Sequence, residues 1–445
     1  MDEEVEKVDS MNRMTKYVAA GLGAVLAFTG MAGCGNSNGV QKTKDGRVKI
    51  VMWHGFSEKD GKTLEKIVKE FNASQKKYEI DAQLQPWSTI GETMITKVAS
   101  GNGPDVVTTG ADNGQGWSID GTFQCIQDFY DNKANGADKF YKTATSQSEF
   151  TIDGKKQQCA IPMAIGPTVV WYNTDMWKAA GLTEADYPKT WDQLLEVAKK
   201  LTKADGSQYG FAMPDAGWGA YYKGNGTGIY SADGKATFDS AENKAFLEKM
   251  RAFFKAGYAK AGLDDTKARE AFESGKAAMV VSGPWEDAAA TDKGIKHDFF
   301  PVPTGEGTYT FPDGSHGSNT GSTGLYFWMT SQVKDKEKKA GLYDFFKYWG
   351  SHDAQVEWSL GSAYPPNNTT VTEDDLSSRP MVARMIGTQK NAFIALQGLK
   401  GGFGDIAATI DGVTSTATRT NKDLGKALSD ANKKIEGYLK EYAAN

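Results

Sequence analysis

Strand-like and helix-like segments alternate between residues 48 and 108, and this order constrains the fold more than any other feature of the chain. The strand-like segments are short and apolar or alternating, and they occupy residues 48–53, 78–84 and 104–108. The intervening segments have helical spacing, with Leu64, Ile67, Val68 and Phe71 on one face and a second helix near residues 90–99. A β-α-β-α-β order predicts a mostly parallel sheet with helices on both faces.

The same alternation returns in the second half of the chain. Strands are predicted at residues 168–172, 277–281 and 324–329, and apolar helical spacing is found at 191–201, 246–254 and 424–439. Thr190 and Gln193 have the spacing of a capping box at the start of one of these helices. The chain therefore has the sequence pattern of two α/β domains with several crossings between them.

The composition narrows the classes of partner. Lys and Arg number 51 and Asp and Glu number 56, well mixed along the chain, so no basic stripe is available for nucleic acid. The four His are scattered without metal-ligand spacing, and no residue pattern calls for a metal or a cofactor. The 11 Trp favour a sugar-stacking surface, because a flat indole matches the apolar face of a pyranose ring.

The segment before residue 34 has the pattern of a secretory signal. A basic start at residues 11–16 is followed by an apolar run at 17–28, small residues and Cys34. This arrangement resembles a bacterial lipoprotein signal, in which the cysteine is lipidated, although Met31 stands where Leu is usual. The apolar run is about a dozen residues, against the roughly 20 that a membrane span needs.

We therefore expect a signal peptide over residues 1–33. Residues 1–10 are expected to come from an upstream start codon and not to belong to the signal itself. Residues 34–46 are expected to form a lipidated Cys34 and a flexible tether, because they are polar and glycine-rich. This predicts a protein held by lipid on the extracellular face of the bacterial membrane. With Cys34 lipidated, Cys125 and Cys159 remain as an even pair in an oxidising compartment.

Four segments in order resemble the family 1 extracellular solute-binding proteins of ATP-driven importers, the maltose-binding-protein-like group. The matching motifs are Gly-Pro-Asp-Val-Val at 103–107, Trp-Tyr-Asn at 171–173 with Pro-Lys-Thr-Trp-Asp at 188–192, Gly-Lys-Ala-Ala-Met at 275–279 with Gly-Pro-Trp at 283–285, and the helix at 340–349 before a Gly-to-Pro-Pro turn at 361–366. Together they span most of the chain from residue 48 onwards.

The resemblance implies a two-lobed α/β fold of the type II periplasmic-binding-protein class, with a ligand cleft and a hinge between the lobes. The first lobe is expected to comprise residues 47–163 and about 315–352, and the second 164–314 and about 353–445. A monomer is implied that binds a carbohydrate, most simply an oligosaccharide, and delivers it to membrane permease subunits. The resemblance also places Cys125 beside Cys159 in the first lobe, which predicts a disulfide.

Candidate ligand-binding residues follow from two arguments. Trp53 ends a predicted strand and His54 follows it, while Asp112 and Asn113 lie in the loop after another. Ligands of open α/β sheets lie beyond the carboxyl ends of strands. The resemblance makes Trp285 a sugar platform, with Glu286 beside it, and Tyr364 a residue of a loop at the cleft. Trp87, Trp218 and Asn319 complete the set, because each lies in a loop-like sequence rich in Gly, Pro or Ser. For several of these, core packing or a solvated turn is an equally good interpretation.

Other function classes remain open at this point. A hydrolase would need two carboxylates about 5–10 Å apart, and the sequence offers candidates by residue type only. It contains no His-Glu-x-x-His motif, Gly-x-Ser-x-Gly occurs only at residues 35–39 in the expected tether, and Ser-x-x-Lys occurs only at residues 74–77 and 331–334, so catalysis is not expected. A non-transporting sugar receptor or adhesin would share the fold, and a peptide or polyol ligand is compatible with the same residues.

Overall fold

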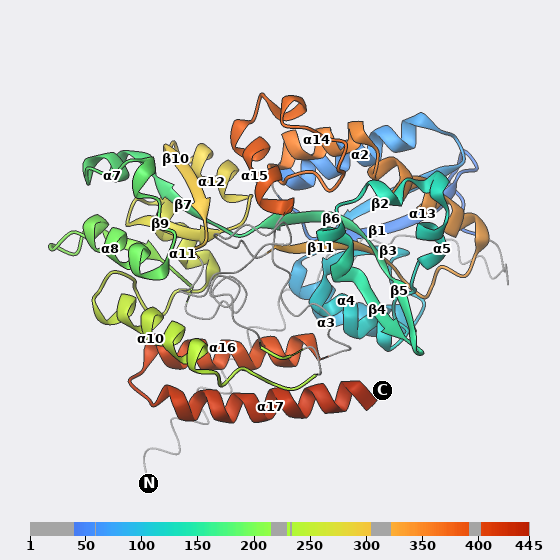
Figure 1. Cartoon of the computed structure of the whole chain (residues 1–445). Helices are drawn as coiled ribbons and strands as arrows, with labels where there is room; N and C mark the ends of the chain where they lie inside the picture. Colours follow the sequence, from blue (N-terminus) through green and yellow to red (C-terminus); the bar gives the residue numbers. More distant parts are fainter. Residues whose placement is uncertain are drawn as a thin grey trace, which may run out of the picture. The chain divides into compact units, whose positions relative to one another are not determined.

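The computed structural model describes residues 40–57, 59–214, 229–231, 234–303, 322–390 and 402–444. Within the unit that begins at Val40, two sheets carry the fold (Figure 1). The first sheet has the order β2 (Tyr78–Leu84), β1 (Val48–His54), β3 (Val106–Gly110), β11 (Ser322–Met329), β6 (Ala160–Pro167). The second has the order β10 (His297–Pro301), β7 (Val169–Asn173), β9 (Ala277–Ser282), β8 (Tyr209–Ala212).

The predicted β-α-β-α-β unit forms the parallel part of the first sheet. Strand β1 pairs in parallel with β2 and β3, and the connecting helices are α2 (Lys59–Ser74) and α3 (Trp87–Ala99). Leu64, Ile67 and Phe71 of α2 are buried, as their helical spacing predicts. The mixed α/β fold expected from the sequence is thus confirmed.

Strand β11 enters the first sheet from far along the chain. It lies antiparallel between β3 and β6, and its Trp328 indole donates a hydrogen bond of 3.0 Å to the carbonyl of Thr109. Pairing between residues more than 150 positions apart is set by tertiary packing, so the strand was predictable but its place in the sheet was not. Its insertion makes this sheet mixed.

One residue, Thr168, separates β6 of the first sheet from β7 of the second (Figure 1). Strand β7 then pairs antiparallel with β9 and β10, while β8 and β9 are parallel. Trp171 of β7 is fully buried and donates a 3.0 Å hydrogen bond to the carbonyl of Gly283. The chain thus crosses between the sheets along almost continuous extended backbone.

Helices cover both sheets, and the remaining bounds are as follows. Beside the first sheet lie α4 (Ala111–Ile119), α5 (Gln127–Asp131), α6 (Lys142–Thr145), α13 (Lys336–Trp349) and α14 (His352–Ser362), with the hairpin of β4 (Glu149–Ile152) and β5 (Lys155–Gln158). The other helices are α7 (Thr174–Ala179), α8 (Trp191–Leu201), α10 (Ala241–Lys255), α11 (Asp265–Glu273), α12 (Glu286–Asp292), α15 (Pro380–Lys390), α16 (Phe403–Arg419) and α17 (Leu424–Ala444).

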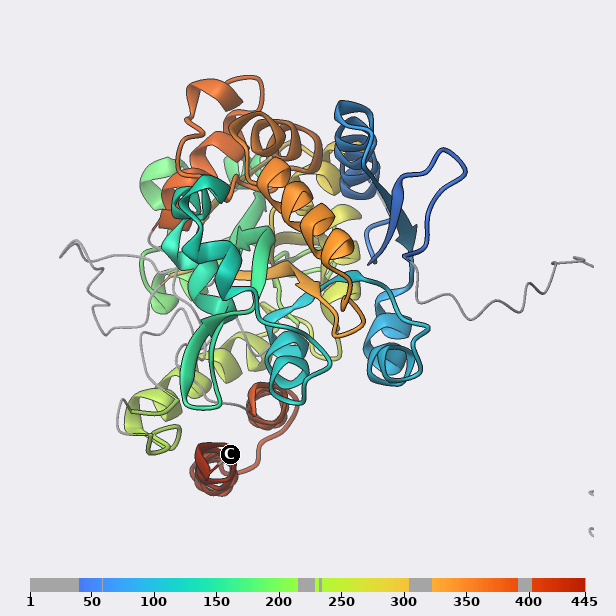
Figure 2. The same cartoon turned by 90° about the vertical axis from the view of Figure 1, so that its right-hand side faces the viewer.

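The last two helices pack side by side, as both views show (Figure 2). Leu428 and Ile435 of α17 join the core of the second sheet together with Ile410 of α16. At the start of α8, the predicted capping box is present, with Thr190 accepting from the Gln193 amide.

Helix α14 departs from the expected lobe boundary at residue 353. It packs against α2, and its Trp358 belongs to the core beneath the first sheet, 5.2 Å from the ring of Trp349. The boundary drawn from the sequence therefore comes too early by at least this helix. The reason is that Trp358, a large apolar side chain, finds its burial against α2 and α13 rather than against the second sheet.

The backbone just before β1 is hydrogen-bonded to the first sheet's first strand. Residues 41–46, expected as tether, form a turn whose ends hydrogen-bond to the start of β1, Thr43 N to Arg47 O and Lys49 N to Gln41 O at 2.8 Å each. The flexible stretch cannot extend to residue 46, because this backbone is paired.

Cys125 and Cys159, 34 residues apart, form a disulfide that joins the segment before α5 to the start of β6. Cys34 lies outside the described residues.

Among the residues that the structure describes, no helix is long and apolar enough to cross a membrane. Within the same ranges, no group of three His, Cys, Asp or Glu could hold a metal ion.

Candidate functional site

A cavity of about 680 Å³ lies where residues from both sheets meet, and we call it the central cavity. Its size is that of a small-molecule site. Its floor includes Ala164 of β6 and Leu325 of β11, which are paired in the ladder. The lining residues are Gly55, Phe56, Ser57, Asp60, Trp87, Thr109, Gly110, Ala111, Asn113, Gln147, Ala164, Asp265, Arg269, Trp285, Gly324, Leu325 and Tyr364.

The cavity lies at the carboxyl ends of the parallel strands β1 and β3. Gly55 to Ser57 follow β1 directly, and Thr109 to Ala111 pass from the end of β3 into α4. Ligands of open α/β sheets bind at this edge, because the loops after the strands all converge there. The second sheet contributes α11 and the turn after β9.

Aromatic rings form a large part of the lining. Trp87, at the start of α3, is 42% exposed and meets the Phe56 ring edge-on at 5.3 Å. A side chain at Gly55 is impossible in this arrangement, since its Cβ would lie 2.2 Å from the Trp87 indole. On the other side, the half-buried Trp285 lies 5.9 Å from the ring of the buried Tyr364. The central cavity thus offers indole surface from elements of both sheets.

Polar groups complete the lining. Asn113 donates to the Thr109 hydroxyl at 3.3 Å and so has its amide held at the wall. The Gln147 side-chain nitrogen is buried and has no hydrogen-bond partner among the described residues, so a donor is available there. Asp60, Asp265 and Arg269 supply charge.

Glu286 lies behind the wall rather than in it. Its side chain has no exposure, and its Oε2 accepts a 2.9 Å hydrogen bond from Nε of Arg269, which does line the cavity. Burial raises the pKa of Glu286, and the Arg269 guanidinium opposes that rise. The carboxylate that was expected to bind a ligand is instead hydrogen-bonded to the arginine that lines the cavity.

The structure brings together four of the residues singled out from the sequence, Trp87, Asn113, Trp285 and Tyr364. It places two others away from the cavity. The Trp53 indole donates to the Gln83 side chain at 3.1 Å on the neighbouring strand β2, and the imidazole of His54 is fully buried. The residues of this segment that line the cavity are Gly55 to Ser57, which follow the end of β1.

Three of the predicted site residues cannot be placed. Trp218 and Asn319 lie outside the described residues, and for Asp112 the structure describes the backbone in α4 but not the side chain.

Sequence reasoning missed Phe56, Asp60, Gln147, Asp265 and Arg269, all of which line the cavity. Phe56 and Asp60 could have been found from the sequence. Ligands lie beyond the carboxyl ends of strands, so the residues that come after β1 are better candidates than those at its end. For Arg269 the signal was weak: it is a charged residue two positions before the Ala271-Phe272 motif, on a helix that looks like an ordinary solvated one.

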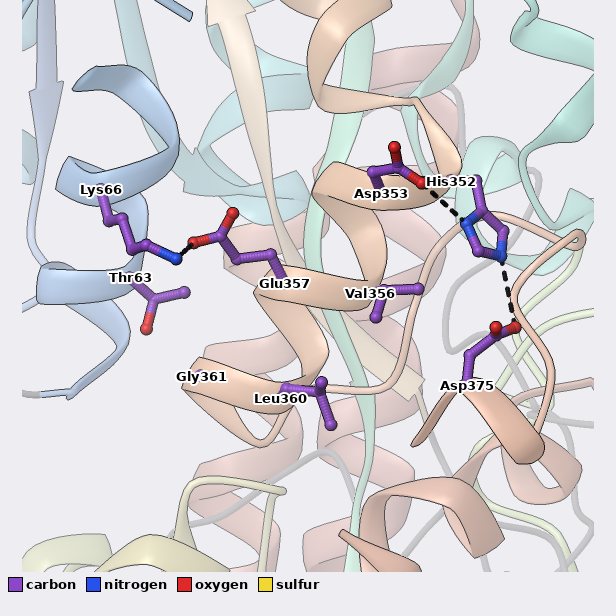
Figure 3. A pocket seen from close by; sticks show the side chains of 9 residues that line it. All are labelled: Thr63, Lys66, His352, Asp353, Val356, Glu357, Leu360, Gly361 and Asp375. Atoms are coloured by element: carbon purple, nitrogen blue, oxygen red, sulfur yellow. Dashed lines mark hydrogen bonds and ion pairs between the residues drawn. The ribbon is translucent and has the colours of Figure 1, made fainter. Parts of the chain in front are cut away.

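A second cavity of about 640 Å³ lies between α2 and α14 (Figure 3). Figure 3 shows its charged groups paired with one another: Lys66 with Glu357, and His352 between Asp353 at 3.1 Å and Asp375 at 3.2 Å. Among the described residues that line it, this imidazole is the one aromatic ring. Its polar groups satisfy each other, so we assign the candidate site to the central cavity.

The comparisons with known proteins agree with this geometry. The family model described as bacterial extracellular solute-binding protein matches residues 55–356. The sn-glycerol-3-phosphate-binding periplasmic protein UgpB of Brucella melitensis is 24% identical over 349 residues, covering 75% of this chain and 77% of the relative.

Solved structures of low sequence identity share the fold. The GacH receptor of Streptomyces glaucescens, whose structures include a complex with acarbose, has a TM-score of 0.74 at 18% identity and covers 88% of this chain and 99% of its own. Maltose-bound MalE3 of T. maritima has a TM-score of 0.73 at 20% identity, covering 87% and 99% respectively.

Proposed function

Because this chain belongs to the bacterial extracellular solute-binding proteins, we propose that its central cavity binds a carbohydrate, most simply an oligosaccharide, for delivery to an ATP-driven importer. Members of this family bind solutes and are not enzymes. The observation that carries the proposal is the pair of indole surfaces, Trp87 and Trp285, that face one cavity from elements of different sheets. The acarbose and maltose complexes of the structural neighbours support the same ligand class.

The proposed mechanism is binding without bond breaking. Sugar rings stack on the indoles, because the C–H face of a pyranose and a flat aromatic ring remove apolar area from water together. The Asn113 amide and the unpartnered Gln147 nitrogen bind hydroxyl groups. A ligand that touches elements of both sheets favours the arrangement in which they are close, by the free energy of those additional contacts.

The chain's lobes are part of this proposal. We assign the first lobe to residues 47–163, about 315–352 and α14, and the second to 164–314 and the helices after α14. Thr168, between β6 and β7, then lies at one of the crossings. Docking of the closed form on membrane permease subunits completes the transport step.

A second ligand class has one observation in its favour. The relatives named for sn-glycerol 3-phosphate match three quarters of the chain, so a phosphorylated polyol is the competing ligand. A hydrolase and a non-transporting receptor are the competing functions. A binding protein returns the sugar intact, whereas a hydrolase shortens it.

A thermal-shift screen tests the proposal. Purified protein starting after residue 34 is melted with maltose, maltotriose, acarbose, a disaccharide and trisaccharide panel, and sn-glycerol 3-phosphate. A ligand at a hundred times its Kd stabilises the folded protein by about 2.7 kcal/mol, which is a clear shift. Chromatography of the ligand afterwards shows whether it is intact. No shift with any carbohydrate, or a shortened product, contradicts the proposal.

Lipid attachment at Cys34 is proposed on the sequence pattern alone. Several acyl chains are needed for firm attachment, since each buried CH₂ contributes about 0.8 kcal/mol. Cys34→Ser is expected to release the protein from the membrane fraction or leave its signal uncleaved. A variant that is processed and membrane-bound as before would refute the anchor.

A further inference from the structure

Arg269 is the one cationic side chain among the described residues of the central cavity. It lies on α11, and 23% of its side chain is exposed. Two carboxylates hold it from its own side of the cavity: Glu286 accepts from Nε at 2.9 Å, and Glu273 lies 3.6 Å from Nη2. Nη1 has no protein partner in the part of the chain that the structure describes, so it is available to a ligand.

Carboxylates outnumber this single cation. Glu286, with no exposed side-chain area, and Glu273 lie next to the guanidinium. Asp265, four residues before Arg269 on α11, and Asp60, at the start of α2, line the same cavity. A phosphate that enters would therefore meet two carboxylates and an arginine whose charge is already compensated. Like charges juxtaposed across an interface disfavour a partner strongly.

We propose that Arg269, positioned by Glu286, is the specificity-determining residue of the central cavity: a charge-compensated donor that binds an uncharged polyhydroxy ligand and rejects a phosphorylated one. This inference rests on the proposed function, because it assumes that the central cavity is the ligand site. Arg269 donates to hydroxyl or ring oxygens. Glu286 is a positioning residue, which acts on the ligand only through the guanidinium.

If the Glu286 carboxylate compensates the charge of Arg269, removing that negative charge should change which ligands bind. Glu286→Gln keeps the shape and a hydrogen-bond acceptor but removes the negative charge behind Arg269. The variant is expected to gain affinity for sn-glycerol 3-phosphate and inorganic phosphate by about tenfold, while its affinity for a neutral sugar changes less. A merely structural role of Glu286 would lower both affinities together.

Removing the Arg269 guanidinium tests whether it binds the neutral ligand. Arg269→Gln alone leaves a buried unpaired carboxylate and destabilises the fold, so the double variant Arg269→Gln/Glu286→Gln, which removes both charges, is the informative one. It is expected to lose at least tenfold in affinity for the tightest neutral sugar, which is about 1.4 kcal/mol. Arg384→Gln is the matched control, since Arg384 pairs with Asp298 and does not line the cavity.

The experiment is calorimetric titration of the wild type and these variants with maltose, maltotriose, acarbose, sn-glycerol 3-phosphate and inorganic phosphate, alongside melting of each unliganded protein. Wild type that binds a neutral sugar, with unchanged affinities in both variants, overturns the inference and leaves the proposed function standing. Wild type that binds sn-glycerol 3-phosphate more tightly than every sugar overturns both. Wild type that binds no sugar while Glu286→Gln gains phosphate binding refutes the proposed function but supports the charge compensation.

Discussion

Trp285 is the residue on which the proposed sugar site depends most. Its indole lines the central cavity and packs against Tyr364 and the core beneath the first sheet. Trp285→Ala is expected to weaken binding of the best sugar by about thirtyfold or more, because central aromatic anchors cost 2 kcal/mol or more on truncation. Titration calorimetry measures the loss.

The same substitution also has a cost in the unliganded protein. Trp285 is half-buried, so the melting temperature of Trp285→Ala is expected to fall somewhat. Trp191→Ala is the matched control, since Trp191 is fully buried in the core of the second sheet and is not among the residues that line the cavity. It should lose stability without a comparable change in affinity. If Trp285→Ala behaves like this control, Trp285 is a packing residue.

His54 predicts an acid sensitivity. Its imidazole is fully buried and neither nitrogen has a hydrogen-bond partner among the described residues. Burial lowers the pKa of His54, which the carboxylate of Glu65 opposes. Because the folded pKa lies below the unfolded value of about 6.5, the neutral side chain supports stability above that pH, and this support is lost as the pH falls.

Replacing His54 by Leu is therefore expected to flatten the decline of melting temperature between pH 7 and pH 5. The measurement is a series of thermal melts across this range. His352→Gln serves as the control, because His352 is on the surface and pairs with Asp353 and Asp375. Parallel pH profiles of wild type and His54→Leu would show that His54 does not titrate in this range.

Helix α12 connects the second sheet to elements beside the first. Its Asp287 accepts from Arg379 at 2.7 Å and from His297 at 3.1 Å, and Arg379 also donates to the carbonyl of Leu360 on α14 at 2.9 Å. The Asp287 side chain is only 6% exposed. This is a buried network in which removing one member leaves charge unpaired.

Asp287→Asn is expected to lower the free energy of unfolding by about 2 kcal/mol or more, since it unpairs a buried cation. Burial opposes the charged form of His297, but its hydrogen bonds to Asp287 and to the Ile295 carbonyl outweigh this and raise its pKa. The charged imidazole thus stabilises the fold below about pH 6.5 and its contribution fades as the pH rises through the folded pKa. Denaturant unfolding should show a larger loss at pH 6 than at pH 8.

The control for this element is Lys59→Ala. Lys59 pairs with Asp292 at the other end of α12, but both side chains are at least half exposed, so the effect should stay below about 1 kcal/mol. If Lys59→Ala lowers the free energy of unfolding as much as Asp287→Asn does, the buried network stabilises the fold no more than an exposed ion pair.

The disulfide fixes the segment before α5 to the edge strand β6. Closing a loop between residues 34 apart removes entropy from the unfolded chain worth about 3–4 kcal/mol in the loop-entropy model. Cys125→Ser/Cys159→Ser should lose stability of this order in denaturant melts. Thiol titration of the unfolded wild type, without reductant, checks the bond itself, and two reactive thiols would contradict it.

At the scale of the whole molecule, ligand binding should change the distance between the parts that carry the two sheets. A sugar that touches both Trp87 and Trp285 favours the more compact arrangement, because its contacts to the second surface exist only there. Small-angle scattering should show a smaller radius of gyration with saturating sugar. Trp285→Ala at equal saturation is expected to show less compaction, and an unchanged radius in the wild type would exclude closure.

The sequence by itself determined the local elements and the fold class. Strand β1, helix α2 and the Thr190–Gln193 cap depend on neighbours within a few residues, and these patterns predicted them. The strand-end rule selected Asn113, a loop-like sequence selected Trp87, and the family resemblance selected Trp285 and Tyr364. All four line the cavity.

Only the tertiary structure decided which side chains meet. The insertion of β11 between β3 and β6, the burial of Trp358 under the first sheet and the pairing of Glu286 with Arg269 join residues distant in sequence. Each depends on the free energy of burying apolar area or satisfying a buried charge in one particular packing, and no local pattern records it. That is why Glu286 was expected to line the site, whereas the fold puts Arg269 at the cavity wall and Glu286 behind it.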